Sequence, residues 1–279
     1  EGAALASALS RISVIAIGLY GVIAVHNLMG TPRPKVFARD VRAFSAIALP
    51  AMATNIATPF ANAYVTASIS TFGDSAVSGW TVIGRIIPVA FGSIFALSGS
   101  VGPIIGQNFG AKNRDRMSEA LTKSIYVSIA FTGVAWIHLA LTADFIVDQL
   151  ATSQEAADLI RLFCYWLAPL FAFLGILFVS NAAFNTLGRP YYSTGLNWGR
   201  ATIGTIPFVL LGGHLAQAPG VLAANMMGGV LFGGLGALLA YRLVDSLAAS
   251  WPATPPPVAP RRDPDTLCQE KAFGSGNID

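Results

Sequence analysis

The sequence predicts an all-α, polytopic membrane protein with about seven transmembrane helices. Hydrophobic residues make up 54% of the 279 positions and charged residues only 11%, whereas soluble domains carry about 25% charged residues. The mean hydropathy is +0.60. The apolar residues also gather in charge-free runs as long as the roughly 20 residues that a helix needs to cross a bilayer. Together these observations exclude a water-soluble enzyme.

Each predicted span is a run without Asp, Glu, Lys or Arg. The runs cover residues 12–31, 43–73, 86–111, 124–143, 162–188 and 201–241. The last run is too long for one helix. Gly212-Gly213 and Pro219-Gly220 predict a turn that divides it, because glycine and proline interrupt helices. We therefore expect seven spans.

Lysine and arginine in the connecting segments predict the orientation. Thirteen lie on one side of the predicted membrane, three (Arg11, Arg85 and Arg161) lie on the other, and Arg200 lies inside a span. Basic loops are retained in the cytoplasm during insertion. We expect a multi-pass protein of a bacterial-type plasma (inner) membrane with a cytoplasmic C-terminus. The net charge of +3 is too small to indicate a nucleic-acid partner.

Two segments differ in composition from the spans. Residues 31–42 contain Arg33, Lys35, Arg39 and Arg42, which predicts a basic cytoplasmic linker. Residues 246–279 contain six prolines, which predicts a disordered cytoplasmic tail. The first residue is Glu and no basic signal sequence follows, so we also expect the chain to begin in mid-protein.

Polar side chains inside the second and fifth spans are the candidate residues of a translocation pathway. The i, i+4, i+8 spacing of residues 54, 58 and 62 places them on one helix face. These side chains either line a water-filled cavity or bind a neighbouring helix, and the sequence leaves both open. The candidates are Thr54, Asn55, Thr58, Asn62, Trp166, Asn181 and Asn185.

Prolines and two arginines mark further irregular positions. Pro50, Pro59, Pro88, Pro103 and Pro207 lie inside spans, and broken helices are typical of proteins that work by alternating access.

Arg85 and Arg200 are possible buried charges. Arg85 is expected near the outer end of its span, where it can reach the interface. Arg200 lies about 15 Å along its helix from Pro190, near mid-depth. For Arg200 we favour a structural bond to helix carbonyls or an asparagine over a role as counter-ion to a buried carboxylate.

No acidic residue falls well inside a span, although a proton or Na⁺ relay normally needs one. We therefore expect the coupling site to lie outside this chain. His26, His138 and His214 are isolated, and no catalytic triad, metal motif or phosphate loop is present. The sequence predicts no enzyme, no metal and no cofactor.

Glycines at GxxxG spacing predict close helix packing. Gly102, Gly106 and Gly110 form one series, and Gly229 with Gly233 forms another.

Three motifs resemble those of the multidrug and toxic compound extrusion (MATE) transporters. They are Gly106-Gln107-Asn108-Phe109-Gly110-Ala111, Asn185-Thr186-Leu187-Gly188-Arg189-Pro190, and Leu49-Pro50 at the start of the second span. The resemblance implies that residues 1–30 hold the last helix of an N-terminal lobe and that residues 31–42 link the lobes. It also implies that residues 43–245 form a six-helix C-terminal lobe, with the N-terminal lobe missing from this chain.

The resemblance also implies a function. MATE proteins enclose a cavity between two lobes and export organic cations in exchange for H⁺ or Na⁺. Many carry an acidic residue in the helix that corresponds to the second span, where Asn55 and Thr58 stand here. We expect secondary active antiport of organic cations, drugs or metabolites. The alternatives are a flippase for lipid-linked substrates and a structural or assembly membrane protein without transport activity.

Overall fold

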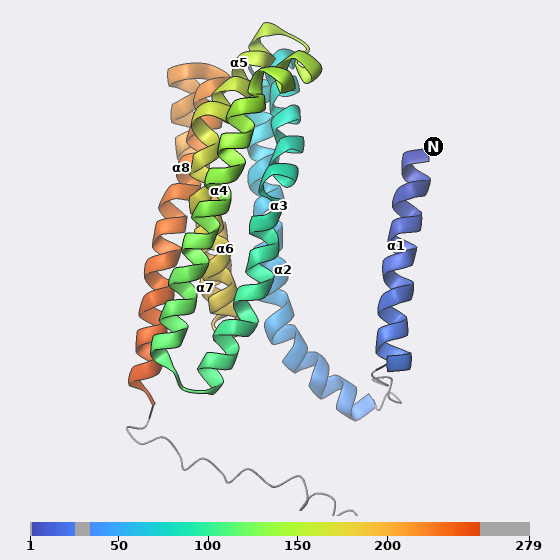
Figure 1. The fold of residues 1–279 in the computed structure, drawn as a ribbon, viewed down its shortest axis with the longest axis vertical. Helices are drawn as coiled ribbons and strands as arrows, with labels where there is room; N and C mark the ends of the chain where they lie inside the picture. The colour runs from blue at the N-terminus through green and yellow to red at the C-terminus, as the bar shows by residue number, and fades with distance from the viewer. Residues whose placement is uncertain (1, 26–33, 252–279) are drawn as a thin grey trace, which may run out of the picture. The chain divides into compact units, whose positions relative to one another are not determined.

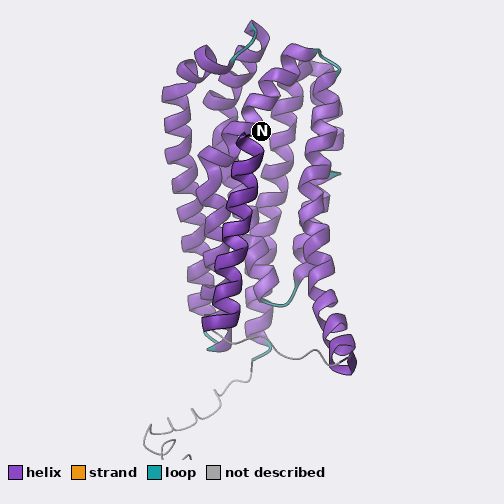
Figure 2. Ribbon diagram, turned by 90° about the vertical axis from the view of Figure 1, so that its right-hand side faces the viewer, coloured by secondary structure: helices purple, strands orange, loops and turns teal. Residues whose placement is uncertain are grey.

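The computed structural model describes residues 2–25 and 34–251, and over these residues the chain is helical and contains no strand (Figure 2). This confirms the predicted all-α fold class. Between residues 34 and 251 the helices follow one another directly or are joined by short turns (Figure 1). In chain order they are α1 (Gly2–Tyr20), η1 (Gly21–Val25), α2 (Pro34–Ser70), α3 (Asp74–Gly110), α4 (Arg114–Leu150), α5 (Gln154–Leu162), η2 (Phe163–Leu167), η3 (Ala168–Leu170), α6 (Phe171–Thr186), α7 (Pro190–Ala201) and α8 (Ile206–Ala249).

The chain consists of two units, Glu1–Ile56 and Ala57–Asp279. The first unit holds α1, η1 and the first part of α2. Its segment Leu5–Val25 has a mean hydropathy of 2.0 and is long enough to cross a membrane.

The expected linker and tail are partly helical. Helix α2 begins at Pro34, so residues 34–42 of the predicted linker belong to a helix, while 31–33 lie outside the described residues. Helix α8 runs to Ala249 and extends past the predicted start of the tail at residue 246. Residues 252–279 and His26 lie outside the described residues.

The second unit is a helical bundle with two apolar cores. In one core, Phe91 of α3 stacks on Phe171 of α6 with ring centroids 4.3 Å apart, and Phe163 meets Phe171 edge-on at 6.0 Å. The other core lies among α3, α4, α6 and α8 and includes Met117 and Phe184. Aromatic pairs of this kind add to the stability that apolar burial provides.

The last long segment, Pro190–Ala249, forms two arms that fold back on each other. Helical geometry breaks at Ala216 and Gln217, inside the predicted turn. A Cβ on Gly212 would lie 2.3 Å from the carbonyl oxygen of Gly220, so the arms touch backbone to backbone. Among the described residues, five segments are long and apolar enough to cross a membrane, and the last of them, Pro190–Ala249, consists of the two arms. This number agrees roughly with the seven predicted spans, the second of which corresponds to α2.

Charged residues collect at the two ends of this bundle. Lys112, Arg114, Arg189 and Arg242 lie where α3 and α8 end and α4 and α7 begin (Figure 1). The other end carries mainly carboxylates, including those at the start of α3, the end of α4 and in α5. This separation agrees with the expected orientation, which remains a prediction.

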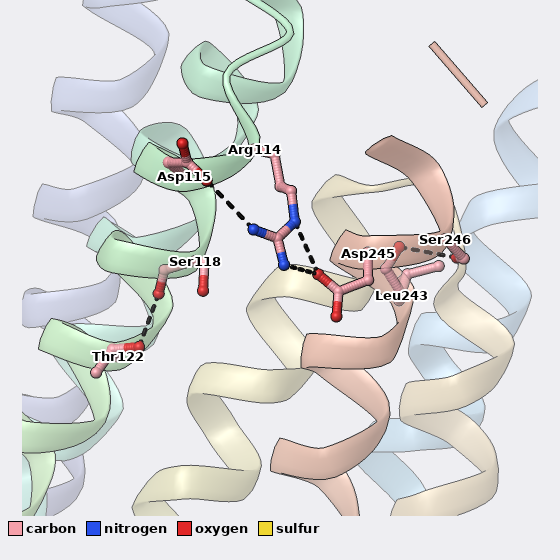
Figure 3. A network of polar contacts seen from close by, with 7 residues as sticks. All are labelled: Arg114, Asp115, Ser118, Thr122, Leu243, Asp245 and Ser246. Atoms are coloured by element: carbon pink, nitrogen blue, oxygen red, sulfur yellow. Dashed lines mark hydrogen bonds and ion pairs between the residues drawn. The ribbon is translucent and has the colours of Figure 1, made fainter. Parts of the chain in front are cut away.

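An ion-pair network joins two helices at the basic end (Figure 3). Arg114 Nη2 lies 2.6 Å from Asp245 Oδ1 of α8, and Arg114 Nη1 lies 3.2 Å from Asp115 Oδ1. Because these side chains are exposed, the pair contributes little to stability. The pair links the first turn of α4 to the last turns of α8.

Some of the glycines at GxxxG spacing lie at close contacts between helices, and others do not. A Cβ on Gly102 or Gly106 would lie 3.0 Å from the Thr186 side chain of α6, and a Cβ on Gly233 would lie 2.2 Å from the Phe173 carbonyl oxygen. Gly110 and Gly229 have no such neighbour within 4 Å. The packing prediction is therefore wrong for those two, because Gly110 ends α3 and Gly229 faces a cavity.

Two neighbouring glycines of α8 test this packing. We expect Gly233→Ala to destabilise the protein by about 1–3 kcal/mol, because its Cβ would force α6 and α8 apart. Gly234→Ala meets open space and is expected to be neutral or to stabilise the helix by up to about 1 kcal/mol. Thermal unfolding of both variants in detergent is the measurement, and equal melting temperatures would contradict the packing.

Candidate functional site

The second unit contains a partly open cavity of about 260 Å³. Its walls come from α2, α3, η3, α6, α7 and α8, so residues far apart in the sequence meet there. Its polar and aromatic lining includes Thr58, Asn62, Trp80, Phe178, Arg200 and Asn225.

Interrupted helices border the cavity. A π-helical turn (η2) and a 3₁₀ turn containing Pro169 (η3) precede α6, and Leu170 and Phe171 at that junction line the cavity. Between α7 and α8 the helix breaks over residues 202–205, directly before Pro207. Proline lacks the amide hydrogen that an uninterrupted helix requires. Irregular backbone of this kind is typical of transporter binding sites.

Arg200 brings a buried positive charge to the cavity. The residue is 8% exposed, and its Nη2 donates a hydrogen bond to Thr58 Oγ1 at 3.1 Å. Its buried Nε has no partner in the structure. Its backbone carbonyl, freed by the helix break, accepts from Thr205 Oγ1 at 2.8 Å. The guanidinium therefore bonds to a hydroxyl rather than to the carbonyl or asparagine that was expected, and its structural role stays a prediction.

The rest of the lining is neutral. Trp80 Nε1 donates to Thr66 Oγ1 at 2.8 Å, which fixes the indole ring between α3 and α2. Phe95 and Phe178 lie with ring centroids 5.0 Å apart, while Asn62 and Asn225 supply amide groups. None of the lining residues, all of which lie between 57 and 251, is Asp or Glu.

Of the predicted pathway residues, the structure brings Thr58 and Asn62 together with Arg200. Thr54 and Asn55 belong to the first unit. Thr54 Oγ1 donates to the Pro50 carbonyl at 2.8 Å, and Asn55 Nδ2 donates to the Ala51 carbonyl at 3.0 Å. Both side chains thus bond to their own helix.

The candidates of the fifth span lie away from the cavity. Trp166 is 74% exposed on η2, and Asn185 is exposed near the end of α6. Asn181 is buried, with its Oδ1 unpartnered, and its backbone carbonyl accepts from Ser193 Oγ of α7 at 3.3 Å. The expected i, i+4 pair therefore does not line this cavity.

Arg85 lies on a different hollow, of about 640 Å³, between α3 and α4. The walls are mainly apolar and include His138. Helix α3 begins at Asp74, so Arg85 lies about 16 Å inside the helix. Because a 37-residue helix is longer than a membrane span needs, Arg85 near the outer end of the span stays a prediction.

Trp80 and Asn225 were not predicted from the sequence. Trp80 precedes the predicted third span because the charge-free run begins only after Arg85, whereas the helix starts eleven residues before that arginine. Asn225 is a polar residue within an apolar run. The same signal identified Asn62, so the sequence pattern of the last span could also have identified Asn225.

Outside the cavity, the described residues contain one cysteine and no metal-binding cluster. No group of three or more His, Cys, Asp or Glu there could hold a metal ion. Cys164 is a free, buried thiol in the apolar core.

Cysteine labelling tests whether the cavity is accessible to water. In a background carrying Cys164→Ala and Cys268→Ser, we expect Asn62→Cys and Asn225→Cys to react with a small methanethiosulfonate reagent. Asn181→Cys is the buried control and is expected to react roughly tenfold more slowly or less, because only an accessible thiolate reacts. Equal rates at Asn181 and Asn225 would contradict the assignment of the cavity.

Comparison with known proteins places this arrangement in a family. Residues 50–211 match the MatE family model. The uncharacterized 21 kDa protein in the iaaL 5′ region of Pseudomonas savastanoi is 34% identical over 224 residues, which are 77% of this chain and 71% of that protein. The FAD transporter of Shewanella oneidensis is 27% identical over 254 residues, which are 90% of this chain and 56% of that protein.

A solved structure has the same fold. The MATE transporter VcmN of Vibrio cholerae, in its bent form, aligns with a TM-score of 0.74 at 20% identity, over 86% of this chain and 56% of that one. The chain thus spans little more than half the length of VcmN and of the FAD transporter. Since the family model covers more than half of the sequence and the Pseudomonas relative is 34% identical, the chain belongs to the MatE family of multidrug and toxic compound extrusion transporters.

Proposed function

We propose that this chain forms one lobe of a secondary active exporter that moves small amphipathic organic molecules out of the cell in exchange for H⁺ or Na⁺. The observation that carries the proposal is the cavity at the two interrupted helices. An apolar bundle that served only as a structural element would gain nothing from helix breaks around a polar hollow. Transporters place substrate sites at such breaks.

The relative lengths support a second lobe. VcmN and the FAD transporter are nearly twice as long as the part that this chain matches. We propose that a preceding lobe of similar size packs across the cavity and that the two rock against each other in the bilayer. In this arrangement the basic end of the bundle is cytoplasmic and the membrane is the inner one.

The coupling site belongs, in this proposal, to the second lobe. A proton or Na⁺ relay needs an ionisable acid at membrane depth, and the cavity lining here has none. Exchange with H⁺ or Na⁺ therefore requires a carboxylate contributed from outside this chain.

The resemblance implies organic cations as substrates, and one relative, the FAD transporter of Shewanella oneidensis, adds metabolites to the range. A flippase for lipid-linked substrates is the alternative within the same architecture. It would need an open apolar path for acyl chains beside the polar cavity, and the hollow between α3 and α4 is a candidate for that path.

A blocked cavity tests the proposal in the two-lobe protein. Gly84 lines the cavity and has no neighbour within 4 Å of a built Cβ, so Gly84→Leu fills the space without a clash. We expect it to reduce efflux of the wild-type substrate, chosen from ethidium and fluorescein, by roughly tenfold. Gly99→Leu is the matched control on the same helix, since Gly99 also meets open space but does not line the cavity.

Equal efflux by the Gly84 and Gly99 variants would contradict a role for the cavity. Absence of flux in the wild type under every ion gradient would instead favour the structural alternative.

The lobe by itself provides a second test. We expect liposomes containing only the 279-residue chain to show no substrate uptake under a pH or Na⁺ gradient, because alternating access needs two moving lobes. Uptake by the isolated chain, above that of empty liposomes, would contradict the two-lobe proposal.

A further inference from the structure

Among the described residues of the second unit, no carboxylate balances the positive charge in the cavity. A guanidinium stays ionised at physiological pH, and a buried charge is costly unless it is paired. The hydrogen-bond acceptor that Arg200 has on a side chain is the neutral hydroxyl of Thr58, 3.1 Å from Nη2. Between residues 57 and 251 the ion pairs lie at the bundle ends, as between Arg114 and Asp245.

Local structure explains how the charge is tolerated. Arg200 lies in the last turn of α7, where the carbonyl ends of the helix create a partial negative charge. That partial charge is smaller than the full charge of the guanidinium. The cavity wall therefore keeps a net positive potential even though the helix end lowers the cost of burial.

The neutral lining would suit the remainder of an organic ligand. Asn62 and Asn225 can donate hydrogen bonds from their amides, while Trp80 and Phe178 present flat apolar rings. The volume of about 260 Å³ is just below the roughly 300–1,000 Å³ of pockets for drug-sized ligands. The space fits a small aromatic acid, or the charged end of a larger molecule.

We propose that this cavity binds aromatic organic anions and that the guanidinium of Arg200 binds their carboxylate. The inference rests on the exporter function proposed above and specifies its substrate class. It departs from the organic cations that the family resemblance implies. A cation in this cavity would lie beside a fixed like charge, and no acid in the lining would attract it.

Matched ligands test the sign of the charge directly. Binding of 1-naphthoate, 1-naphthylmethylammonium and 1-naphthalenemethanol is measured by calorimetry with the purified two-lobe protein in uncharged detergent. The three share one ring system and differ in charge. We expect the anion to bind at least roughly tenfold more tightly than the cation and the alcohol. A cation that binds as tightly as the anion would overturn the inference.

Substitutions assign the preference to Arg200. We expect Arg200→Gln to weaken naphthoate binding roughly tenfold or more and to leave the alcohol unchanged, while Arg200→Lys retains part of the preference. Arg85→Gln is the matched control, because Arg85 is exposed on the other hollow. Unchanged naphthoate affinity in a folded Arg200→Gln protein would overturn the inference. If Arg200→Gln does not fold, Gly84→Leu replaces it as the test variant. Undiminished naphthoate binding by Gly84→Leu would also overturn the inference.

Two further measurements distinguish this inference from a lipid-headgroup site and from the exporter proposal. If phosphatidylglycerol displaces naphthoate at equal concentration and phosphatidylcholine does not, the cavity is a lipid-headgroup site and the inference is wrong. Flux in proteoliposomes distinguishes the two proposals. Preferred export of the cation refutes the anion site and retains the exporter, whereas selective anion binding without any flux retains the site and refutes the exporter.

Discussion

Hydrocarbon offers no hydrogen bonds to a peptide backbone, and this constraint determines where the bundle is regular and where it is broken. Helix α4 runs for 37 residues without a proline and satisfies its own amides and carbonyls, whereas α3, of equal length, carries Pro88 and Pro103 inside it. The breaks at η2–η3 and at residues 202–205 occur instead where the backbone borders a cavity. Thr205 donates to the carbonyl of Arg200 there and replaces a helical bond. The irregular backbone and the polar hollow therefore have one physical origin.

Close backbone contacts hold this broken region together. The two arms of the last segment touch at Gly212 and Gly220, and again where a Cβ on Gly228 would lie 2.3 Å from the Gly204 carbonyl oxygen. Tight packing of the arms keeps Arg200 near Asn225, because α7 cannot move away from α8. Gly229, one residue after Gly228, has open space above it and leaves room in the cavity. Gly228 thus allows close contact between the arms, whereas Gly229 leaves space in the cavity.

Much of the fold could be predicted from the sequence, because hydropathy and charge determine which segments enter a bilayer. The spans, the turn around Ala216 and Gln217, and the basic end of the bundle follow from that pattern. The site was harder to predict. Spacing shows which residues share a helix face but not which neighbour that face meets. Thr58 and Asn62 therefore reach the cavity while Asn181 packs against α7. The beginning of α3 was misplaced because an arginine can lie within a helix whose flank faces a hollow.

The central claim is that a buried guanidinium, unbalanced by any acid of this lobe, makes the cavity attractive to an anion. The most direct measurement is a crystal structure of the two-lobe protein soaked with 4-bromobenzoate, using anomalous scattering to locate bromine. The account predicts a bromine peak in the cavity, with the carboxylate within hydrogen-bonding distance of Arg200. A carboxylate side chain of the second lobe already paired with Arg200, and no bromine in the cavity, would contradict it.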